Sequence, residues 1–130
     1  MTPEVEGPFA GCVLVVDDDE GIRETLCELV ELAGCSARGA ANGAEALKML
    51  TDGLPCLVIL DLIMPVMTGL EFLDALRKDP CFASVPVVIS TSAPERAPAG
   101  VPVIPKPIDI DSVIHWMKRT CACAVDLPVV

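Results

Sequence analysis

The stretch LVILDLIMPVMTGLEFL, residues 57–73, places one carboxylate directly after four aliphatic side chains. Residues 57–60 are too few for a helix and are apolar on both faces, a pattern typical of a strand buried on two sides in a parallel sheet. Asp61 therefore stands where a buried strand ends. It is either a loop acid that leaves the core or a side chain positioned for chemistry, and the rest of the sequence favours chemistry.

Size and charge restrict the class of protein. The chain has 130 residues, close to the usual size of one domain, and 52% of them are apolar, which is enough to build a core. Its 9 basic and 19 acidic side chains give a net charge of −10. So acidic a chain is a poor match for nucleic acid, which is bound by clustered Lys and Arg, and a better match for divalent cations or a basic protein surface.

The sequence lacks the patterns of a membrane span and of a secretory signal. Apolar runs fall short of the roughly 18–20 residues that cross a bilayer, and the start, MTPEVEGPFAG, has neither a basic nor an apolar signal region. We therefore expect a cytoplasmic protein without a membrane partner. We predict a flexible lead-in at residues 1–10, a folded domain at residues 11–122 and a C-terminal tail at residues 123–130.

The sequence has seven cysteines, and those that lie in apolar segments are predicted to be small buried hydrophobic side chains. Five of them are scattered through apolar segments, which favours burial. These five are Cys12, Cys27, Cys35, Cys56 and Cys81. Cys121 and Cys123 form a C-x-C pair near the end. A metal or redox role for this pair is the less favoured interpretation, because no second cluster of Cys or His accompanies it.

Apolar runs of two kinds alternate along the chain. Short continuous apolar runs predict strands at residues 12–16, 56–60, 85–91 and 101–105, and residues 35–40 predict a weaker second strand. Apolar residues at helical spacing predict helices at residues 20–33, 44–51, 69–78 and 110–121, with Leu70 and Ile110 among the inward side chains and Asp109 as the last cap. Right-handed crossovers then give an α/β fold, a doubly wound parallel sheet of five strands with helices on both faces.

Polar side chains follow these strands at their carboxyl ends, where ligands bind in such sheets. They are Asp17, Asp18 and Asp19 after the first strand, Asp61 after the third, Ser90, Thr91 and Ser92 at the fourth, and Lys106 after the fifth. Converging carboxylates repel one another unless a hard cation such as Mg²⁺ neutralises them. A carboxylate beside Mg²⁺, a hydroxyl and an ammonium group can accept a phosphoryl group.

Four motifs in this order resemble the receiver domain of two-component response regulators. VLVVDDDE resembles the opening strand and acidic pair of that family, and LVILDLIMPVMTGLEFL resembles its phosphoacceptor segment, with Met64, Pro65 and Gly69 in the usual places. VPVVISTS resembles the fourth strand with its switch hydroxyl, and IPKPID resembles the Lys-Pro step that closes the site. The similarity covers residues 12–121 and implies a flavodoxin-like sheet of strand order 2-1-3-4-5.

The resemblance implies a metal site and a phosphoacceptor. Asp61 would accept the phosphoryl group. Asp18 and Asp61 would bind Mg²⁺ directly, together with the main-chain carbonyl of Ile63, and Asp17 would act mainly through water.

The resemblance also implies a switch, a closing lysine and a donor. Thr91, which follows Asp61 by 30 residues (91 − 61), would be the switch hydroxyl. Lys106 would be aimed at the phosphoryl group by a cis Lys106–Pro107 peptide. The phosphoryl group would come from the phosphohistidine of a sensor histidine kinase or of a histidine phosphotransfer protein.

Two features depart from the family pattern. Val103 stands where many relatives carry Tyr or Phe, so the usual aromatic partner of the switch hydroxyl is missing. Thr91 and Lys106 are 15 residues apart (106 − 91), several fewer than expected, and Pro94 and Pro98 flank the segment that should form a helix. Because Pro breaks a helix interior, we predict that the helix between the fourth and fifth strands is shortened or absent.

These departures leave the output of the protein open. The leading interpretation is a single-domain receiver, not otherwise an enzyme, that signals to an unknown downstream protein by contact, as a monomer or a homodimer. Ile63 and Ala93 are apolar and orient no water, so slow hydrolysis of the phosphoryl group is expected. A pseudo-receiver that binds a partner without phosphorylation is the alternative. An Asp-nucleophile phosphatase is disfavoured, because Ile63 stands where its second Asp should be.

Overall fold

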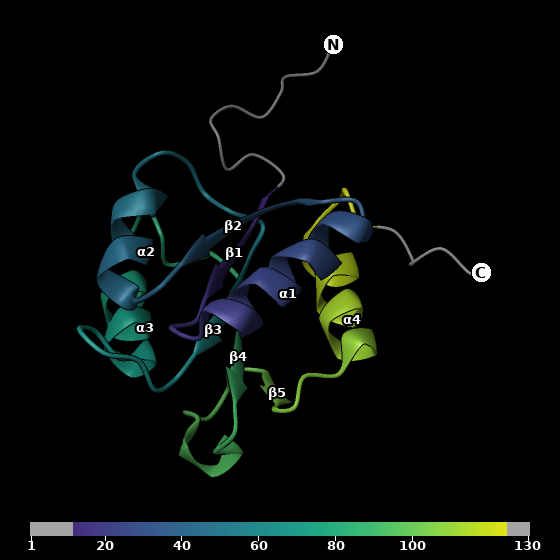
Figure 1. Cartoon of the computed structure of the whole chain (residues 1–130). Coiled ribbons are helices and arrows are strands. Elements are labelled where there is room, and N and C mark those ends of the chain that lie inside the picture. Colours follow the sequence, from purple (N-terminus) through teal and green to yellow (C-terminus); the bar gives the residue numbers. More distant parts are fainter. Residues whose placement is uncertain (1–11, 125–130) are drawn as a thin grey trace.

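Five parallel strands lie between two layers of helices in the computed structural model, which describes residues 12–124 (Figure 1). In chain order the elements are β1 (Cys12–Val16), α1 (Glu20–Leu32), β2 (Ser36–Ala40), α2 (Gly43–Leu50), β3 (Leu57–Asp61), α3 (Gly69–Lys78), β4 (Val87–Thr91), the 3₁₀ helix η1 (Pro94–Arg96), β5 (Val103–Pro105) and α4 (Ile110–Thr120). The strand order is β2-β1-β3-β4-β5, and every pairing is parallel. The predicted sheet and its 2-1-3-4-5 order are confirmed.

Different helices cover the two faces of the sheet. Successive residues of a strand point to opposite faces. Val13 and Val15 of β1 accordingly pack in a cluster with α1 and α4, whereas Leu14 and Val16 pack in a cluster with α2 and α3. Figure 1 shows α1 and α4 on one side of the sheet and α2 and α3 on the other. Because β1, β3 and β4 are buried on both faces, they need the continuous apolar runs that mark them in the sequence, whereas the edge strand β2 is largely exposed and lacks such a run.

Side-chain caps lie at the start of α1, α2 and α3, and those of α1 and α3 lie beside the acidic strand ends. The carboxylate of Asp19 accepts a hydrogen bond from the N–H of Ile22 at the start of α1. Thr68 and Glu71 form a capping box at the start of α3. Each cap satisfies backbone N–H groups that have no partner inside the helix. Since α1 follows β1 and α3 follows β3, both capped ends lie at the carboxyl edge of the sheet.

The helix predicted to be shortened is reduced to a single turn. The 3₁₀ helix η1 has 3 residues and begins at Pro94, and Pro98 follows it closely. Ala97 and Val101 from the same connection pack against the cluster on the α2 and α3 side. An irregular loop therefore covers the sheet beside β5, itself only 3 residues long, which confirms the prediction from the two prolines.

Some details of the helix predictions are wrong. Leu70 and Ile110 were expected to point inward, but they are 46% and 49% exposed. Both stand in the first turn of a helix, and Phe72 takes the buried position in α3 instead. Asp109 precedes α4 as predicted, but its carboxylate accepts a hydrogen bond from the hydroxyl of Ser112 rather than from a backbone N–H.

Four of the seven cysteines form disulfides, which were not predicted from the sequence. Cys35 forms a disulfide with Cys123, and Cys56 forms one with Cys121. The C-x-C pair therefore does have partners, which the sequence did not reveal because they lie 88 and 65 residues away. They meet because the end of α4 packs beside the residues that precede β2 and β3.

The other three cysteines are free thiols. Cys12 is buried, as predicted, and burial raises the pKa of its thiol to about 11. Cys27 is half-buried, and burial raises the pKa of its thiol as well. Cys81 is exposed, contrary to the prediction, since it lies in the turn after α3 rather than in a strand or helix.

The predicted lead-in at residues 1–10 and most of the predicted tail lie outside the described residues. Of that tail, residues 123 and 124 are described, and Cys123 is held by its disulfide. Within residues 12–124, none of the helices combines the length and the apolar character that crossing a bilayer requires.

Gly69 begins α3 at the point where the chain passes closest to β3. A Cβ atom at this position would overlap the carbonyl oxygen of Asp61 and lie 2.7 Å from the Cα of Leu62. Backbone atoms cannot move aside as the end of a flexible side chain can. We predict that Gly69→Ala lowers the free energy of unfolding by about 2 kcal/mol or more, as measured by urea denaturation.

Gly21→Ala provides the matched control. Gly21 lies in the first turn of α1, and a Cβ atom there would lie 3.4 Å from Oδ1 of Asp19, an ordinary contact. Because Ala favours the helix over Gly, the free energy of unfolding should stay the same or rise by up to about 1 kcal/mol. Equal stability of the two variants would contradict the close approach at Gly69.

Candidate functional site

Adjacent strand ends bring two aspartates to the same edge of the sheet. In the pairing of β1 with β3, Val16 lies opposite Leu60, and the next residues are Asp17 and Asp61. The backbone N–H of Asp17 also donates a hydrogen bond to the carbonyl of Ala40 at 3.1 Å. Asp17 is therefore held in line with the sheet although β1 ends one residue earlier.

Three carboxylates converge at this edge. Asp17, Asp18 and Asp61 each offer one oxygen, and these oxygens lie within 4.8 Å of one another. Asp17 and Asp61 are only 2% and 7% exposed, whereas Asp18 is exposed to solvent. In the part of the chain that the structure describes, no other group of three or more Asp, Glu, His or Cys side chains has this spacing. The structure thus brings together the acids that the sequence singled out.

An ammonium group lies against two of these acids. Nζ of Lys106 is 3.0 Å from Oδ2 of Asp17 and 3.5 Å from Oδ1 of Asp61. The lysine follows β5, and its backbone N–H donates a hydrogen bond to the carbonyl of Thr91 at 2.8 Å. The Lys106–Pro107 peptide is cis, as predicted. The lysine therefore reaches the acidic edge from the far side of β4.

Burial and neighbouring charges together shift the pKa values of Asp61 and Lys106. Loss of solvent raises the pKa of the Asp61 carboxyl, and the charge of Asp17 raises it further. The charge of Lys106 and a hydrogen bond from the backbone of Ile63 lower this pKa, but it stays above its ordinary value. Burial lowers the pKa of Lys106, yet the hydrogen bond and charge of Asp17, with those of Asp61, raise it overall. The lysine is therefore held in its charged form.

The hydroxyl residues at the end of β4 have different surroundings. Thr91 is 1% exposed, and its Oγ1 accepts a hydrogen bond from the backbone N–H of Ala93 at 3.0 Å. Ser90 pairs with Asp61 across β3 and β4, and its buried Oγ has no hydrogen-bond partner among the described residues. Thr91 stands one residue closer to the carboxyl edge than Ser90. Its role as the switch hydroxyl stays a prediction.

The loop between β3 and α3 is strained beside Asp61. Val66 has φ 70°, a left-handed conformation that β-branched residues rarely adopt, and its side chain is 80% exposed. The backbone N–H of Gly69 donates a hydrogen bond to the carbonyl of Leu62 at 2.9 Å, which holds the loop in place. Ile63 is 56% exposed in this loop, and the metal role of its carbonyl stays a prediction.

Arg23 also belongs to this site, although no motif in the sequence points to it. Its guanidinium donates a hydrogen bond from Nη1 to the carbonyl oxygen of Asp17 at 2.8 Å. The backbone N–H of Asp19 donates another to Oδ1 of Asp17 at 2.9 Å. The available signal was a basic residue in the second turn of a helix that starts beside the acids. These bonds fix the Asp17 backbone and carboxylate from the α1 side.

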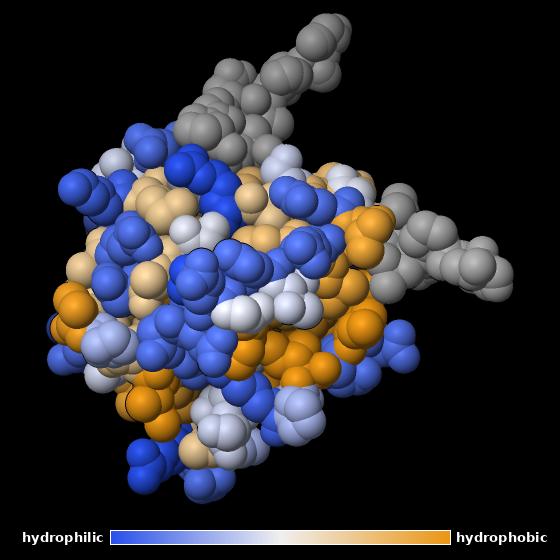
Figure 2. Space-filling model, viewed as in Figure 1, coloured by the Kyte–Doolittle hydropathy of each residue, from blue (hydrophilic) through white to orange (hydrophobic). Residues whose placement is uncertain are grey.

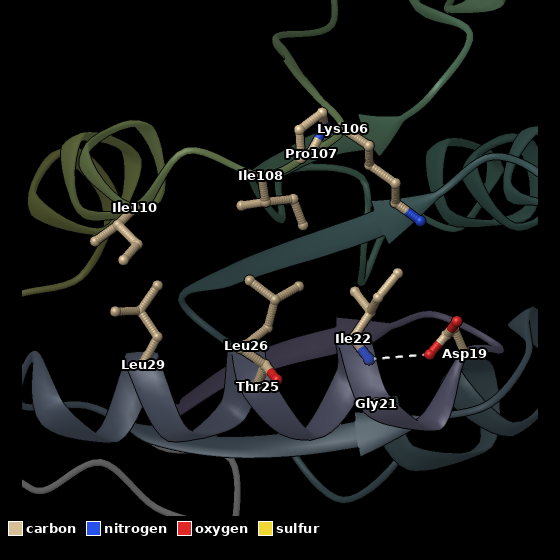
Figure 3. Close-up of a pocket in the computed structure, with 10 residues that line it drawn as sticks. All are labelled: Asp19, Gly21, Ile22, Thr25, Leu26, Leu29, Lys106, Pro107, Ile108 and Ile110. Atoms are coloured by element: carbon tan, nitrogen blue, oxygen red, sulfur yellow. Dashed lines mark hydrogen bonds between the residues drawn. The ribbon is translucent and has the colours of Figure 1, made fainter.

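An apolar groove of about 530 Å³ opens beside the acidic site (Figure 3). Its apolar walls are Ile22, Leu26 and Leu29 from α1 and Pro107, Ile108 and Ile110 from the segment that leads from β5 into α4. Lys106 and Asp19 stand at one end of the groove, and the two apolar walls point toward each other along it (Figure 3). Figure 2 shows hydrophobic residues gathered between α1 and α4 on this face.

The donor set of the site fits a hard divalent cation. Carboxylate oxygens are the ligands that Mg²⁺ prefers, and it keeps further positions for water or phosphate oxygens. The three converging carboxylates can supply such ligands. A partly buried carboxylate beside an ammonium group can also act as a nucleophile toward a phosphoryl group, whose negative charge the cations would stabilise.

Comparison with known protein sequences agrees with this chemistry. Residues 13–116 match the response regulator receiver domain. Response regulator Rre1 of Synechocystis is 43% identical over 81 residues, which cover 62% of this chain and 35% of Rre1. Response regulator MprA of a Mycobacterium species is 31% identical over 111 residues, which cover 82% of this chain and 48% of MprA. The chain thus spans less than half the length of these curated relatives.

Solved structures share the fold. Chemotaxis protein CheY4 of Vibrio cholerae has a TM-score of 0.74 and 29% identity, over 84% of this chain and 97% of CheY4. Response regulator TrrA of Thermotoga maritima, in complex with Mg(2+)-BeF, has a TM-score of 0.74 and 32% identity, over 84% of this chain and 97% of TrrA. From the match over residues 13–116 and the acids and lysine at the carboxyl edge of its sheet, this chain belongs to the response regulator receiver domains of two-component systems.

Proposed function

We propose that Asp61 accepts a phosphoryl group from the phosphohistidine of a sensor histidine kinase or a histidine phosphotransfer protein, and that the phosphorylated protein signals by contact with another protein. One observation carries the proposal. Three carboxylate oxygens lie within 4.8 Å of one another, and Nζ of Lys106 lies against two of these carboxylates. A nucleophile, a cation site and a fixed ammonium group are what phosphoryl transfer to a carboxylate requires.

The transfer is a displacement at phosphorus. A carboxylate oxygen of Asp61 forms the new P–O bond while the P–N bond of the phosphohistidine breaks, and the imidazole leaves with that electron pair. Lys106 stabilises the charge on the phosphoryl oxygens. The hydroxyl of Thr91 already accepts a hydrogen bond from Ala93, so its own proton can be donated to a phosphoryl oxygen.

Mg²⁺ is the cofactor that we assign to the three acids. Asp17, Asp18 and Asp61, with the carbonyl of Ile63, would hold it, and the bound ion would supply the remaining positive charge. Asp17 already bonds to Lys106, so it is suited to contact the ion through water while Asp18 and Asp61 bind it directly. The complex of the similar TrrA with Mg(2+)-BeF supports this assignment.

We assign the groove between α1 and α4 to the phosphodonor protein. A donor must bring its phosphohistidine to the carboxyl edge of the sheet, and the groove runs up to that edge, with Lys106 and Asp19 at one end. Its apolar walls fit an apolar face of a donor helix. Ile110 is 49% exposed, so a docked donor would bury apolar surface of its side chain, which would favour docking.

The phosphoryl group on Asp61 should be long-lived, and the protein should act in the cytoplasm. The chain is a phosphoacceptor rather than an enzyme that acts on a separate substrate. Ile63 and Ala93 offer no polar side chain to orient an attacking water, so hydrolysis should be slow. We place this signalling in the cytoplasm, and the net charge of −10 favours a protein rather than a nucleic acid as the next partner.

Asp61→Asn tests the phosphoacceptor. After incubation with acetyl phosphate and Mg²⁺, intact mass spectrometry should show one added phosphoryl group on the wild type and none on the variant, because an amide is a poor nucleophile. Asp52→Asn changes an exposed acid and should be phosphorylated like the wild type. A wild type that gains no phosphoryl group would contradict the proposal and favour a module that binds its partner without phosphorylation.

Mg²⁺ should raise the Tm of the wild type, because a ligand of the folded state stabilises that state. Asp18→Asn removes an exposed carboxylate without disturbing the core, and it should weaken Mg²⁺ binding about tenfold or more in a titration followed by Tm. Asp19→Asn is the matched control, since Asn also caps a helix. The same loss of affinity in both variants would exclude Asp18 as a specific ligand.

Ile110→Asp tests the groove. The side chain is 49% exposed at the start of α4, so the variant should fold. We expect phosphotransfer from an autophosphorylated histidine kinase to slow by about tenfold or more, because docking would bury the new charge. Uptake from acetyl phosphate, which is too small to need the groove, should not change.

Leu32→Asp is the control for the groove. Leu32 is 65% exposed at the end of α1 and does not line the groove. Transfer from the kinase to this variant should match that to the wild type. Equal slowing of both variants, or a slower reaction of Ile110→Asp with acetyl phosphate, would contradict the assignment.

A further inference from the structure

Two disulfides tie the segment after α4 to the edge of the sheet opposite Asp61. Cys35 directly precedes β2, and Cys56 directly precedes β3. They bond to Cys123 and Cys121 respectively, and the Cα atoms are 5.3 Å apart in each pair, a normal separation for a disulfide. In Figure 1 the end of α4 lies at the same end of the molecule as the start of β1. The bonds are therefore at the amino edge of the sheet.

The two bonds straddle β1. Because β1 lies between β2 and β3, residues 121–123 connect the two neighbours of β1 across its amino end. Cys35 and Cys121 are each 4% exposed and belong to the cluster beneath α1 and α4. Cys56 and Cys123 are half-buried. Each disulfide thus joins a buried cysteine to a more accessible one, through which an external thiol can approach the bond.

Pairing is selective among the cysteines of residues 12–124. Cys12 begins β1 between the two disulfides and remains a thiol, and burial raises its pKa to about 11, which leaves little reactive thiolate. Cys27 and Cys81 also remain thiols. The four paired cysteines are those that the fold brings to one edge.

We propose that Cys35, Cys56, Cys121 and Cys123 form a thiol–disulfide switch, which clamps the end of α4 and the segment after it when oxidised and releases them when reduced. Disulfides form in oxidising conditions and are reduced in an ordinary cytoplasm, so a protein that acts there meets both states as redox conditions change. The switch lies at the opposite edge from Asp61. It goes beyond the proposed phosphorylation and does not depend on it.

The oxidant is a small-molecule disulfide of the glutathione class. A protein thiolate attacks it, forms a mixed disulfide and releases one external thiol. The partner cysteine then attacks the mixed disulfide, closes the protein bond and releases a second external thiol. For each protein bond, two protein thiols are oxidised, one external disulfide is reduced, and the two protons pass to the external thiols. Reduction follows the same steps in reverse.

The clamp should affect both stability and local opening. The bonded residues are 88 and 65 positions apart, and both loops contain β3, β4, β5 and α4. Closing long loops restricts the unfolded chain and so favours the folded state. Lys118 and Arg119 are exposed in the last turn of α4, just before Cys121. Trypsin cleavage at these residues therefore reports whether that turn is released.

Alkylation of the denatured protein followed by intact mass spectrometry counts the free thiols and so shows whether the two disulfides are formed. Four of the seven cysteines are in disulfides, which leaves three others (7 − 4 = 3). In protein equilibrated with oxidised glutathione, each of these three should carry either an alkyl group or one glutathione, and the other four should carry neither. Phosphine-reduced protein should carry seven alkyl groups. Reduction should lower the Tm by roughly 10 °C or more. It should also speed trypsin cleavage after Lys118 or Arg119 by about tenfold or more.

Variants separate the switch from the other thiols. The double variant Cys121→Ser/Cys123→Ser should behave like reduced wild type in either buffer, and Cys27→Ser/Cys81→Ser should switch like untreated wild type. Seven alkyl groups on the wild type after oxidised glutathione, or equal cleavage rates in both buffers, would overturn the proposal. So would a zinc ion retained by the reduced protein, because thiolates that ligate a metal do not release the segment. These wild-type measurements decide the question even if the first double variant does not fold.

Discussion

The close approach of Asp17 and Asp61 at the ends of adjacent strands is the constraint on which the rest of the structure depends. Both acids are nearly buried, and two carboxylates without solvent destabilise a fold unless their charge is compensated. Lys106 compensates part of it through its contacts of 3.0 and 3.5 Å. A divalent cation would compensate more. The strand order makes the approach unavoidable, because it places β1 directly beside β3.

The molecule separates its chemistry between the two edges of one sheet. The carboxyl edge holds the acids and the lysine, and the amino edge holds the two disulfides. β3 connects them, since Asp61 is its last residue and Cys56 precedes its first. At about 3.3 Å per residue, these two residues are roughly 15–20 Å apart. The proposed phosphorylation and the proposed thiol exchange would therefore act at opposite ends of the same strand without sharing any atoms.

The acidic site does not require a full helix between β4 and β5, where only the 3₁₀ turn η1 is present. Strand ends carry Asp17, Asp61, Thr91 and, just beyond β5, Lys106, and all of these remain in place although only the turn η1 is left of the helix. Val103, whose side chain is smaller than the Tyr or Phe expected from the family pattern, packs against the cluster on the α2 and α3 side. The surface near η1 therefore departs from the family pattern, whereas the charged groups at the carboxyl edge follow it. A partner that binds this surface must therefore recognise an irregular loop rather than a helix.

The amino-acid sequence alone determined the strands, the acidic edge and the shortened helix. Strands buried on both faces need continuous apolar runs, and Pro94 and Pro98 exclude a long helix whatever surrounds them. Only the tertiary structure decided the partners of the C-x-C pair, the bond of Arg23 to Asp17 and the exposure of Leu70 and Ile110. Sequence periodicity reports which face of a local segment is apolar, but not which distant segment covers that face. The disulfide partners, 88 and 65 residues apart, are therefore set by the packing of α4 against the sheet.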